Sequence, residues 1–155
     1  MERPELGTIL LIEDEDSDAT ILCRGFEKAK VLNPIFHLKD GDEALLYLEG
    51  RQKYADRTIF PLPILILLDL KLPGSTGFQI LQWMRVRPEI ARIPVVVLTS
   101  DDAQDTINSA YDLGANSYLV KSGEPAQVTR MVAALRDYWI NLNEAPKLVT
   151  GADAA

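Results

Sequence analysis

Cysteine is almost absent from this sequence. Cys23 is the only one among 155 residues, so neither an internal disulfide nor a thiolate metal cluster can form. Long hydrophobic runs are also lacking, since the longest, Leu62 to Leu68, is interrupted by Pro63 and is far too short to cross a bilayer. The opening MERPELGT lacks the apolar core of a signal peptide. These absences favour a cytoplasmic protein over a secreted or membrane-spanning one.

Positive charge is in short supply as well. The chain has 16 lysines and arginines against 23 aspartates and glutamates, a formal net charge of −7. Such a chain has no overall positive field to attract DNA, RNA or an anionic membrane. We therefore expect no direct binding to nucleic acid and none to membranes.

Apolar, β-prone runs alternate with amphipathic segments along the chain. The runs predict strands at 8–12, 35–39, 64–68, 93–98 and 117–120. Helices are predicted after each strand, with Ser17, Asp40 and either Asp101 or Asp102 as N-caps and with the last helix at 127–142. Residues 51–63, which include two prolines, are predicted to form a long surface loop.

This alternation indicates an α/β fold, because inner strands that are apolar on both sides need helices on both faces of a parallel sheet. We predict a doubly wound, five-stranded parallel sheet in a single domain over residues 1–142. The remaining residues, 143–155, are predicted to form a partly disordered C-terminal extension.

Polar residues follow four of the predicted strands. Glu13 and Asp14 follow the first, Asp69 the third, Thr99 the fourth and Lys121 the fifth. Because functional groups in open α/β sheets gather beyond the carboxyl ends of the strands, these side chains are expected at one edge. Clustered carboxylates repel one another unless a cation lies among them, and Mg²⁺ prefers carboxylate, phosphate and water oxygens. Singly, each residue is typical of a cap, a turn or a surface charge; together they indicate phosphoryl transfer with Mg²⁺.

Four segments carry a family resemblance: Leu10-Leu-Ile-Glu-Asp14, Leu67-Leu-Asp-Leu-Lys-Leu-Pro-Gly74, Val97-Leu-Thr-Ser100 and Ser117-Tyr-Leu-Val-Lys121. Over about residues 7–142 the chain resembles the receiver domain of two-component response regulators. The resemblance implies a flavodoxin-like sheet with strand order 2-1-3-4-5. It also implies a sensor histidine kinase as the partner that donates the phosphoryl group.

The resemblance further implies roles for residues that match the family's motifs. Asp69 matches the phosphoacceptor, and Asp14, Asp69 and the backbone carbonyl of Lys71 match the ligands of Mg²⁺. Glu13 matches the acidic residue that holds a metal-bound water.

Two more positions match groups that contact the phosphoryl oxygens, Thr99 and Lys121. Tyr118, three residues before the lysine, matches the aromatic residue that switches together with the threonine. The alternative for Tyr118 is a plain strand aromatic.

One sequence feature departs from the usual pattern of the family, and a set of features resembles one of its subfamilies. Many receivers have a cis-proline after the lysine, whereas Ser122 and Gly123 follow here, so the geometry of the Lys121–Ser122 peptide stays open. The Lys-Ser junction, the proline-containing loop before the third strand and the aromatic-rich last helix resemble the small response regulators that partner cyanobacterial and bacterial phytochromes. This narrower resemblance implies a phytochrome as the kinase.

Two other functions compete with this interpretation. A haloacid dehalogenase-like phosphohydrolase also uses a strand-end aspartate, but it needs a second aspartate two residues later, where this chain has Lys71. A receiver-like binding module that is never phosphorylated would usually have lost Asp69, Thr99 or Lys121. We therefore expect a signalling phosphoacceptor rather than an enzyme acting on an external substrate. The thirteen residues after Leu142 are too few for a DNA-binding output domain.

The last predicted helix suggests a homodimer. It is longer than the strand beneath it, so its final turns, with Tyr138, Trp139 and Leu142, are predicted to project and to form an interface. The extension from Asn143 to Val149 would lie across the partner; alternatively, it folds back on its own subunit.

Two polar residues outside these motifs receive no special role. His37, the only histidine, is interpreted as a packing residue on a strand. Asp18 is interpreted as part of the general negative field near the first strand rather than as a ligand.

Overall fold

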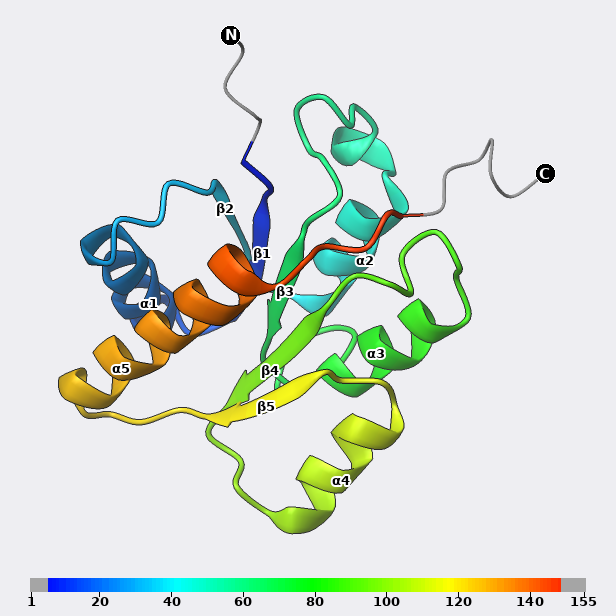
Figure 1. Ribbon diagram of the computed structural model, residues 1–155. Coiled ribbons are helices and arrows are strands. Elements are labelled where there is room, and N and C mark those ends of the chain that lie inside the picture. Colours follow the sequence, from blue (N-terminus) through cyan, green and yellow to red (C-terminus); the bar gives the residue numbers. More distant parts are fainter. Residues whose placement is uncertain (1–5, 149–155) are drawn as a thin grey trace, which may run out of the picture.

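A five-stranded parallel sheet forms the centre of the protein (Figure 1), as seen in a computed structural model that describes residues 6–148. Its strand order is β2-β1-β3-β4-β5, which confirms the predicted flavodoxin-like topology. Every neighbouring pair is parallel, and Ile9 of β1 lies in register with both Ile35 of β2 and Leu65 of β3. The strands are β1 (Ile9–Ile12), β2 (Ile35–Leu38), β3 (Leu65–Leu68), β4 (Val95–Thr99) and β5 (Ser117–Val120).

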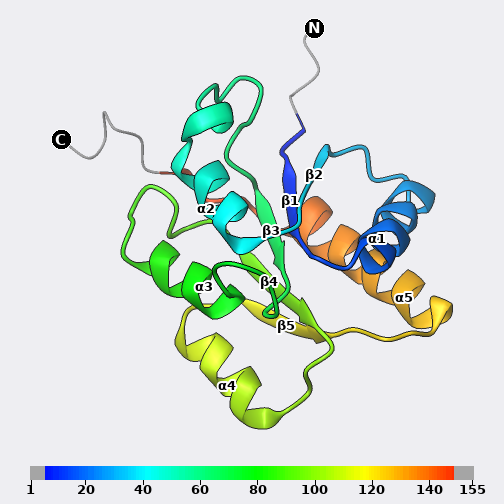
Figure 2. The same ribbon diagram turned by 180° about the vertical axis from the view of Figure 1, so that it is seen from behind.

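The helices cover both faces of the sheet in a three-layer arrangement. Helices α1 (Asp16–Lys28) and α5 (Pro125–Leu135) lie side by side on one face. Figure 2, seen from behind, shows α2 (Gly41–Glu49), α3 (Gly77–Arg85) and α4 (Gln104–Asp112) on the other. The sheet is therefore covered by protein on both sides, as the purely apolar inner strands predict.

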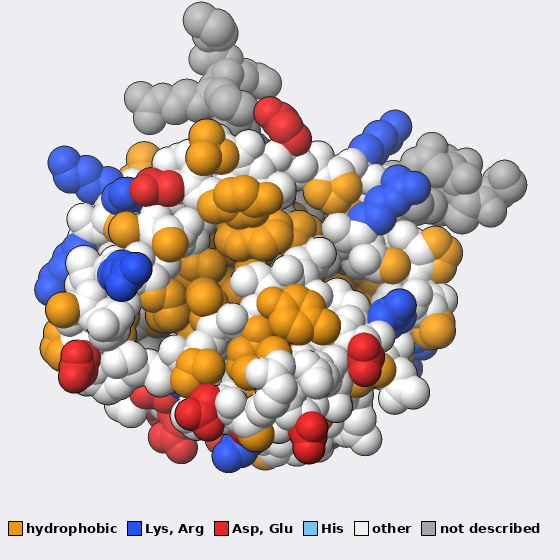
Figure 3. Space-filling model, turned by 60° about the horizontal axis from the view of Figure 1, so that its bottom comes forward, with side chains coloured by type: hydrophobic (Ala, Val, Ile, Leu, Met, Phe, Trp, Pro, Cys, Tyr) orange, Lys and Arg blue, Asp and Glu red, His pale blue; other side chains and the backbone are white. Residues whose placement is uncertain are grey.

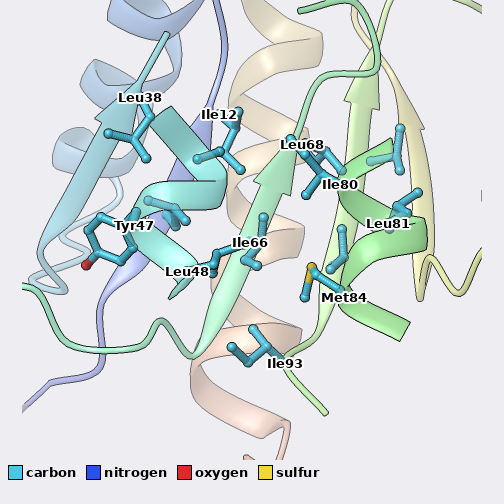
Figure 4. Packing of buried hydrophobic residues seen from close by; sticks show 14 of the residues in the cluster. Ile12, Leu38, Tyr47, Leu48, Ile66, Leu68, Ile80, Leu81, Met84 and Ile93 are labelled. Atoms are coloured by element: carbon cyan, nitrogen blue, oxygen red, sulfur yellow. The ribbon is translucent and has the colours of Figure 1, made fainter. Parts of the chain in front are cut away.

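Alternating residues of each inner strand point into two separate hydrophobic cores. In β1, Leu10 and Ile12 face α2 and α3, whereas Ile9 and Leu11 face α1 and α5. Figure 4 shows the first core, in which Ile66 of β3 lies between residues of α2 and of α3. Because β1 and β3 are buried on both faces, their carboxyl ends are fixed firmly where the polar residues begin.

Two predicted N-caps are wrong. Helix α1 begins one residue before Ser17, with Glu15 as N-cap and no capping side chain. Helix α4 has Ala103 as N-cap. Asp101 instead accepts hydrogen bonds from the Ala103 N–H (2.9 Å) and from the Thr106 hydroxyl (3.2 Å). Aspartate readily accepts from the backbone two residues on, so it forms a turn here rather than the cap itself.

The predicted loop at 51–63 is more ordered than its composition indicates. It contains a short 3₁₀ helix, η1 (Gln52–Tyr54), whose Tyr54 is buried and bonds to Glu43. Arg57 donates to the carbonyl oxygens of Tyr47 and Leu48 (2.8 Å each), which satisfies the end of α2. Aromatic packing among Phe36, Tyr47, Tyr54 and Phe60 holds the loop to α2 and β2.

The C-terminal part differs from the predicted single helix at 127–142. Helix α5 begins at Pro125 and continues after Leu135 as π-helical turns, η2 (Arg136–Leu142). Beyond it, the Lys147 carbonyl accepts from Arg92 (3.0 Å), and Leu148 packs against the core on the α2–α3 side. Residues 143–148 thus fold back on their own subunit, the alternative considered above. Val149 and the predicted disordered end lie outside the described residues.

No helix within residues 6–148 is long and apolar enough to span a membrane.

Candidate functional site

The carboxyl ends of β1, β3, β4 and β5 meet at one edge of the sheet. The Asp69 N–H donates to the Ile12 carbonyl (3.0 Å), and the Lys121 N–H donates to the Thr99 carbonyl (2.8 Å). The strand ladder therefore continues into the polar residues and sets their positions. The structure brings together Glu13, Asp69 and Lys121, as predicted from the strand ends.

Lys121 lies at the centre of this cluster. Its Nζ donates to Asp69 Oδ2 (2.8 Å), to Asp18 Oδ2 (3.1 Å) and to Glu13 Oε1. The side chains of Glu13 and Asp69 are only 4% and 7% exposed, and that of Lys121 is 17% exposed. The ammonium group therefore neutralises carboxylates that water reaches poorly.

Burial and hydrogen bonding shift the ionisation of these groups in opposite directions. Burial raises the pKa of Glu13 to about 8, and the neighbouring Asp69 carboxylate adds to this rise while Lys121 opposes it. Burial also acts to raise the pKa of Asp69, but the neighbouring Glu13 carboxyl group and the bonds from Lys121 and the Lys71 N–H outweigh it and hold the pKa below its usual value. Burial acts to lower the pKa of Lys121, yet its bonds to Asp69, Glu13 and Asp18 raise it. Burial thus favours the neutral form of Glu13, whereas Lys121 favours the ionised form of Asp69.

The acidic residues are arranged as ligands for a divalent cation. Glu13, Asp14 and Asp69 each offer a carboxylate oxygen, and these oxygens lie within 4.8 Å of one another. Glu13 Oε2 is buried without a hydrogen-bond partner. Because buried polar atoms are rarely left unpaired, this oxygen fits a site completed by a cation and its water. The all-oxygen donor set suits Mg²⁺ or Mn²⁺ rather than a soft metal.

A second unpaired atom lies on the neighbouring strand. Thr99 is 1% exposed, and its Oγ1 has no hydrogen-bond partner. The Lys71 N–H donates to Asp69 Oδ1 (3.1 Å) and so orients the Asp69 carboxylate. A carboxylate held in place, a buried hydroxyl without a partner and an ammonium group form a site suited to a phosphoryl group.

Comparison with known proteins identifies the family of this chain. Residues 9–133 match the response regulator receiver domain. The chain belongs to this family. The receiver is 36% identical over 149 residues to the probable methanogenesis regulatory protein FilR2 of Methanothrix harundinacea, covering 94% of this chain and 92% of FilR2. It is 33% identical over 138 residues to the response regulator Rcp1 of Synechocystis sp., covering 89% and 92% of the two chains.

Two solved structures share the fold of this receiver closely. The phosphorylated cyanobacterial phytochrome response regulator RcpA gives a TM-score of 0.85 at 32% identity, covering 92% of this chain and 99% of RcpA. The Mn²⁺-bound form of Rcp1 gives a TM-score of 0.83 at 32% identity, covering 91% and 99%. Both likenesses extend over nearly the whole of each chain.

Hydrogen bonds join the loop after β3 to the start of α2 in this receiver. Asp42 accepts from the Ser75 N–H (3.1 Å) and hydroxyl (2.6 Å), and the Gly41 N–H donates to the Pro73 carbonyl (3.0 Å). A side chain at Gly41 would clash with the Ser75 backbone, and Gly74 has a φ of +72°. These contacts fix the loop that carries Lys71.

Tyr118 connects β5 to the segment after β4. Its hydroxyl donates to the Asp101 carbonyl (2.7 Å), and its ring packs half-buried against the α2–α3 core. Tyr118 therefore contacts the segment that begins two residues after Thr99. The described chain has no cis peptide bond, which makes the Lys121–Ser122 peptide trans.

Two residues at this edge make contacts that the sequence analysis does not predict. Asp18 bonds to Lys121, although it was assigned only to the general negative field. Its place in the first turn of the helix that follows β1 is the signal that indicates this edge of the sheet. His37 Nε2 lies 2.6 Å from the Glu13 carbonyl oxygen, so it ties β2 to the loop after β1. That contact crosses between strands, and no local pattern indicates it.

Proposed function

We propose that this receiver accepts a phosphoryl group on Asp69 from a sensor histidine kinase. The observation that carries the proposal is the Asp69 carboxylate, which is held by Lys121 and the Lys71 N–H, with the unpaired Thr99 hydroxyl at the end of the neighbouring strand. Lys121 and the Lys71 N–H reach the carboxylate from different segments, and Thr99 ends the strand beside β3, so these groups favour one edge of the sheet for an incoming phosphoryl group.

The transfer needs one bond to form and one to break. An oxygen of Asp69 attacks phosphorus, the P–N bond to the kinase histidine breaks, and the electron pair stays on the imidazole nitrogen, which takes up a proton. The product is an acyl phosphate on Asp69. The raised pKa of Lys121 keeps its ammonium charged, so it can stabilise negative charge on the phosphoryl oxygens. Positioning and electrostatics supply most of the rate in such reactions. Slow hydrolysis of this bond is the only other reaction that we assign to the protein.

Mg²⁺ is the proposed cofactor, with Asp14, Asp69 and the Lys71 carbonyl as ligands and Glu13 binding through a water. When bound, Mg²⁺ would neutralise charge on the carboxylates and on the phosphoryl oxygens. Support comes from the carboxylate cluster and the unpaired Glu13 Oε2, and from the Mn²⁺-bound form of the related Rcp1.

A phytochrome is the proposed kinase partner. The support is the likeness to RcpA, which is a cyanobacterial phytochrome response regulator, over 92% of this chain. We place the exchange in the cytoplasm, where ATP feeds histidine kinases. The similarity to FilR2 shows that the same architecture occurs in a regulator named for another process, so the partner is tested separately below.

The proposed switch joins Thr99 and Tyr118. A phosphoryl group on Asp69 would give Thr99 Oγ1 the hydrogen bond that it lacks, and a small movement of β4 would follow. Because Tyr118 bonds to Asp101 just beyond Thr99, that movement would weaken or break the bond. The altered face of α4 and β5 would then signal through protein contact rather than through DNA.

A homodimer through α5 and β5 is also proposed. Tyr138 and Leu142 are 53% and 72% exposed, while Trp139 is half-buried against the α1–α5 core. Figure 3 shows a hollow lined by hydrophobic side chains on this face, and a cavity of about 600 Å³ lies between Leu119 of β5 and α5. Apolar area of this kind favours a second copy of the chain.

Sedimentation equilibrium should give a dimer for the natural sequence and a monomer for Tyr138→Ala with Leu142→Ala. A monomer in both cases would refute the dimer.

Phosphotransfer from a purified kinase tests the main proposal. A bacterial phytochrome kinase is labelled on its histidine with radioactive ATP and mixed with the receiver in Mg²⁺. Label should move to the natural protein within seconds to minutes and not to Asp69→Asn, and an unrelated histidine kinase should transfer much more slowly. Equal transfer from both kinases would contradict the phytochrome link. Transfer to Asp69→Asn would contradict the phosphoacceptor.

A further inference from the structure

Asp18 occupies a position at the site that none of the roles above uses. It lies in the first turn of α1, and its Oδ2 accepts a hydrogen bond from Lys121 Nζ at 3.1 Å. It does not belong to the carboxylate cluster of Glu13, Asp14 and Asp69 that would hold a cation. Asp18 therefore serves the lysine and not the metal.

The hydrogen-bonding capacity of Lys121 is fully used in this structure. A lysine ammonium has three N–H donors and no acceptor. The three acceptors here are Glu13, Asp18 and Asp69. A phosphoryl oxygen can therefore bond to Lys121 only if one of these partners is given up.

The exposure of the three partners decides which one is lost. Glu13 is 4% exposed and already has one unpaired oxygen, so water could not readily replace the ammonium group at its other oxygen. Asp69 carries the incoming phosphoryl group itself. Asp18 is 44% exposed, and water can replace Lys121 at its carboxylate with little loss of free energy. Lys121 is thus expected to exchange Asp18 for the phosphoryl oxygen.

We propose that Asp18 is a positioning residue that holds Lys121 in the unphosphorylated site and slows phosphoryl transfer to Asp69. This inference rests on the proposed function of Asp69 as phosphoacceptor. Asp18 also borders a cavity of about 320 Å³ that contains Asp69 and Lys121, between α1 and the start of α5. Its negative charge therefore acts on the ammonium group from the wall of this cavity.

Acetyl phosphate is the probe, because it is small and needs no kinase surface. An Asp69 oxygen forms the new P–O bond, the bond between phosphorus and the acetyl oxygen breaks, and acetate leaves with the electron pair. Initial rates in Mg²⁺ are followed by intact mass for the natural protein, Asp18→Asn, Asp18→Glu and Asp16→Asn. Asp16 is the matched control, because it lies in the same turn of α1 but pairs with Lys39 at 2.6 Å.

Asp18→Asn should be phosphorylated about threefold to fivefold faster than the natural protein, the size expected for loss of a half-exposed ion pair. Asp18→Glu retains a carboxylate within reach of Lys121 and should restore the slow rate. Asp16→Asn should match the natural protein, since its lost charge does not contact Lys121.

The outcomes separate this inference from the proposed function. An unchanged or slower rate in Asp18→Asn overturns the role of Asp18, while phosphorylation of the natural protein leaves the phosphoacceptor intact. Equal acceleration in Asp16→Asn also overturns it, because the effect would then come from the general charge of α1. If the natural protein gains no phosphoryl group, both the proposed function and this inference fall.

Discussion

Replacing Lys121 with methionine should destabilise the metal-free protein strongly. The side chain retains similar length, but the ammonium group that bonds to Glu13 and Asp69 is lost. Those two carboxyl groups are 4% and 7% exposed, so water cannot compensate them. Breaking a buried ion pair by removing one partner typically costs about 3–5 kcal/mol.

The loss expected here lies below that range, at about 2–3 kcal/mol, because Lys121 is partly exposed and Glu13 can bind a proton. For a domain of this size the melting temperature should fall by about 5–10 °C. Urea unfolding in EDTA, followed by tryptophan fluorescence, measures the free energy directly. Millimolar Mg²⁺ should restore much of it, since the cation then neutralises the same carboxylates.

A matched control is Lys39→Met, which removes an exposed ion pair with Asp16 and should leave stability nearly unchanged. If Lys121→Met were as stable as the natural protein in EDTA, the buried carboxylates would not depend on the ammonium group. The electrostatic account of the site would then be wrong.

Three further predictions follow from the site and the core. Glu13→Gln should gain stability relative to the natural protein in EDTA as pH rises from 4.5 towards about 8, because the raised pKa of Glu13 gives stability at low pH that ionisation removes; a pH-independent difference in urea midpoints would contradict this. Asp14→Ala should abolish saturable Mg²⁺ binding measured by amide chemical shifts, and unchanged binding would displace the proposed site. Ile66→Ala, at a fully buried position in β3, should cost about 3 kcal/mol in urea unfolding; a loss near zero would contradict the packing shown for the core.

The fold and the strand-end groups were predictable because both depend on local pattern. Apolar runs such as Ile9–Ile12 and Leu65–Leu68 mark buried parallel strands, and the residue after each run must lie at the carboxyl edge. Parallel topology then brings Asp69 and Lys121 together without any knowledge of their contacts.

What sequence could not provide depends on contacts between distant segments. Asp18 and Lys121 are 103 residues apart, and the fold brings them together by placing the start of α1 near the end of β5. Leu148 packs against the α2–α3 core, a contact that periodicity does not encode. The 51–63 loop looked polar and proline-rich, yet Arg57 satisfies the carbonyl oxygens at the end of α2 and orders it.

Intact mass after incubation with acetyl phosphate and Mg²⁺ tests the central claim most directly. The natural protein should gain one phosphoryl group, lost on treatment with hydroxylamine as expected of an acyl phosphate, and peptide mapping should place it on Asp69. Asp69→Asn should gain none. A natural protein that stays unmodified, or a phosphoryl group that persists in Asp69→Asn, would contradict the assignment of Asp69 as the phosphoacceptor.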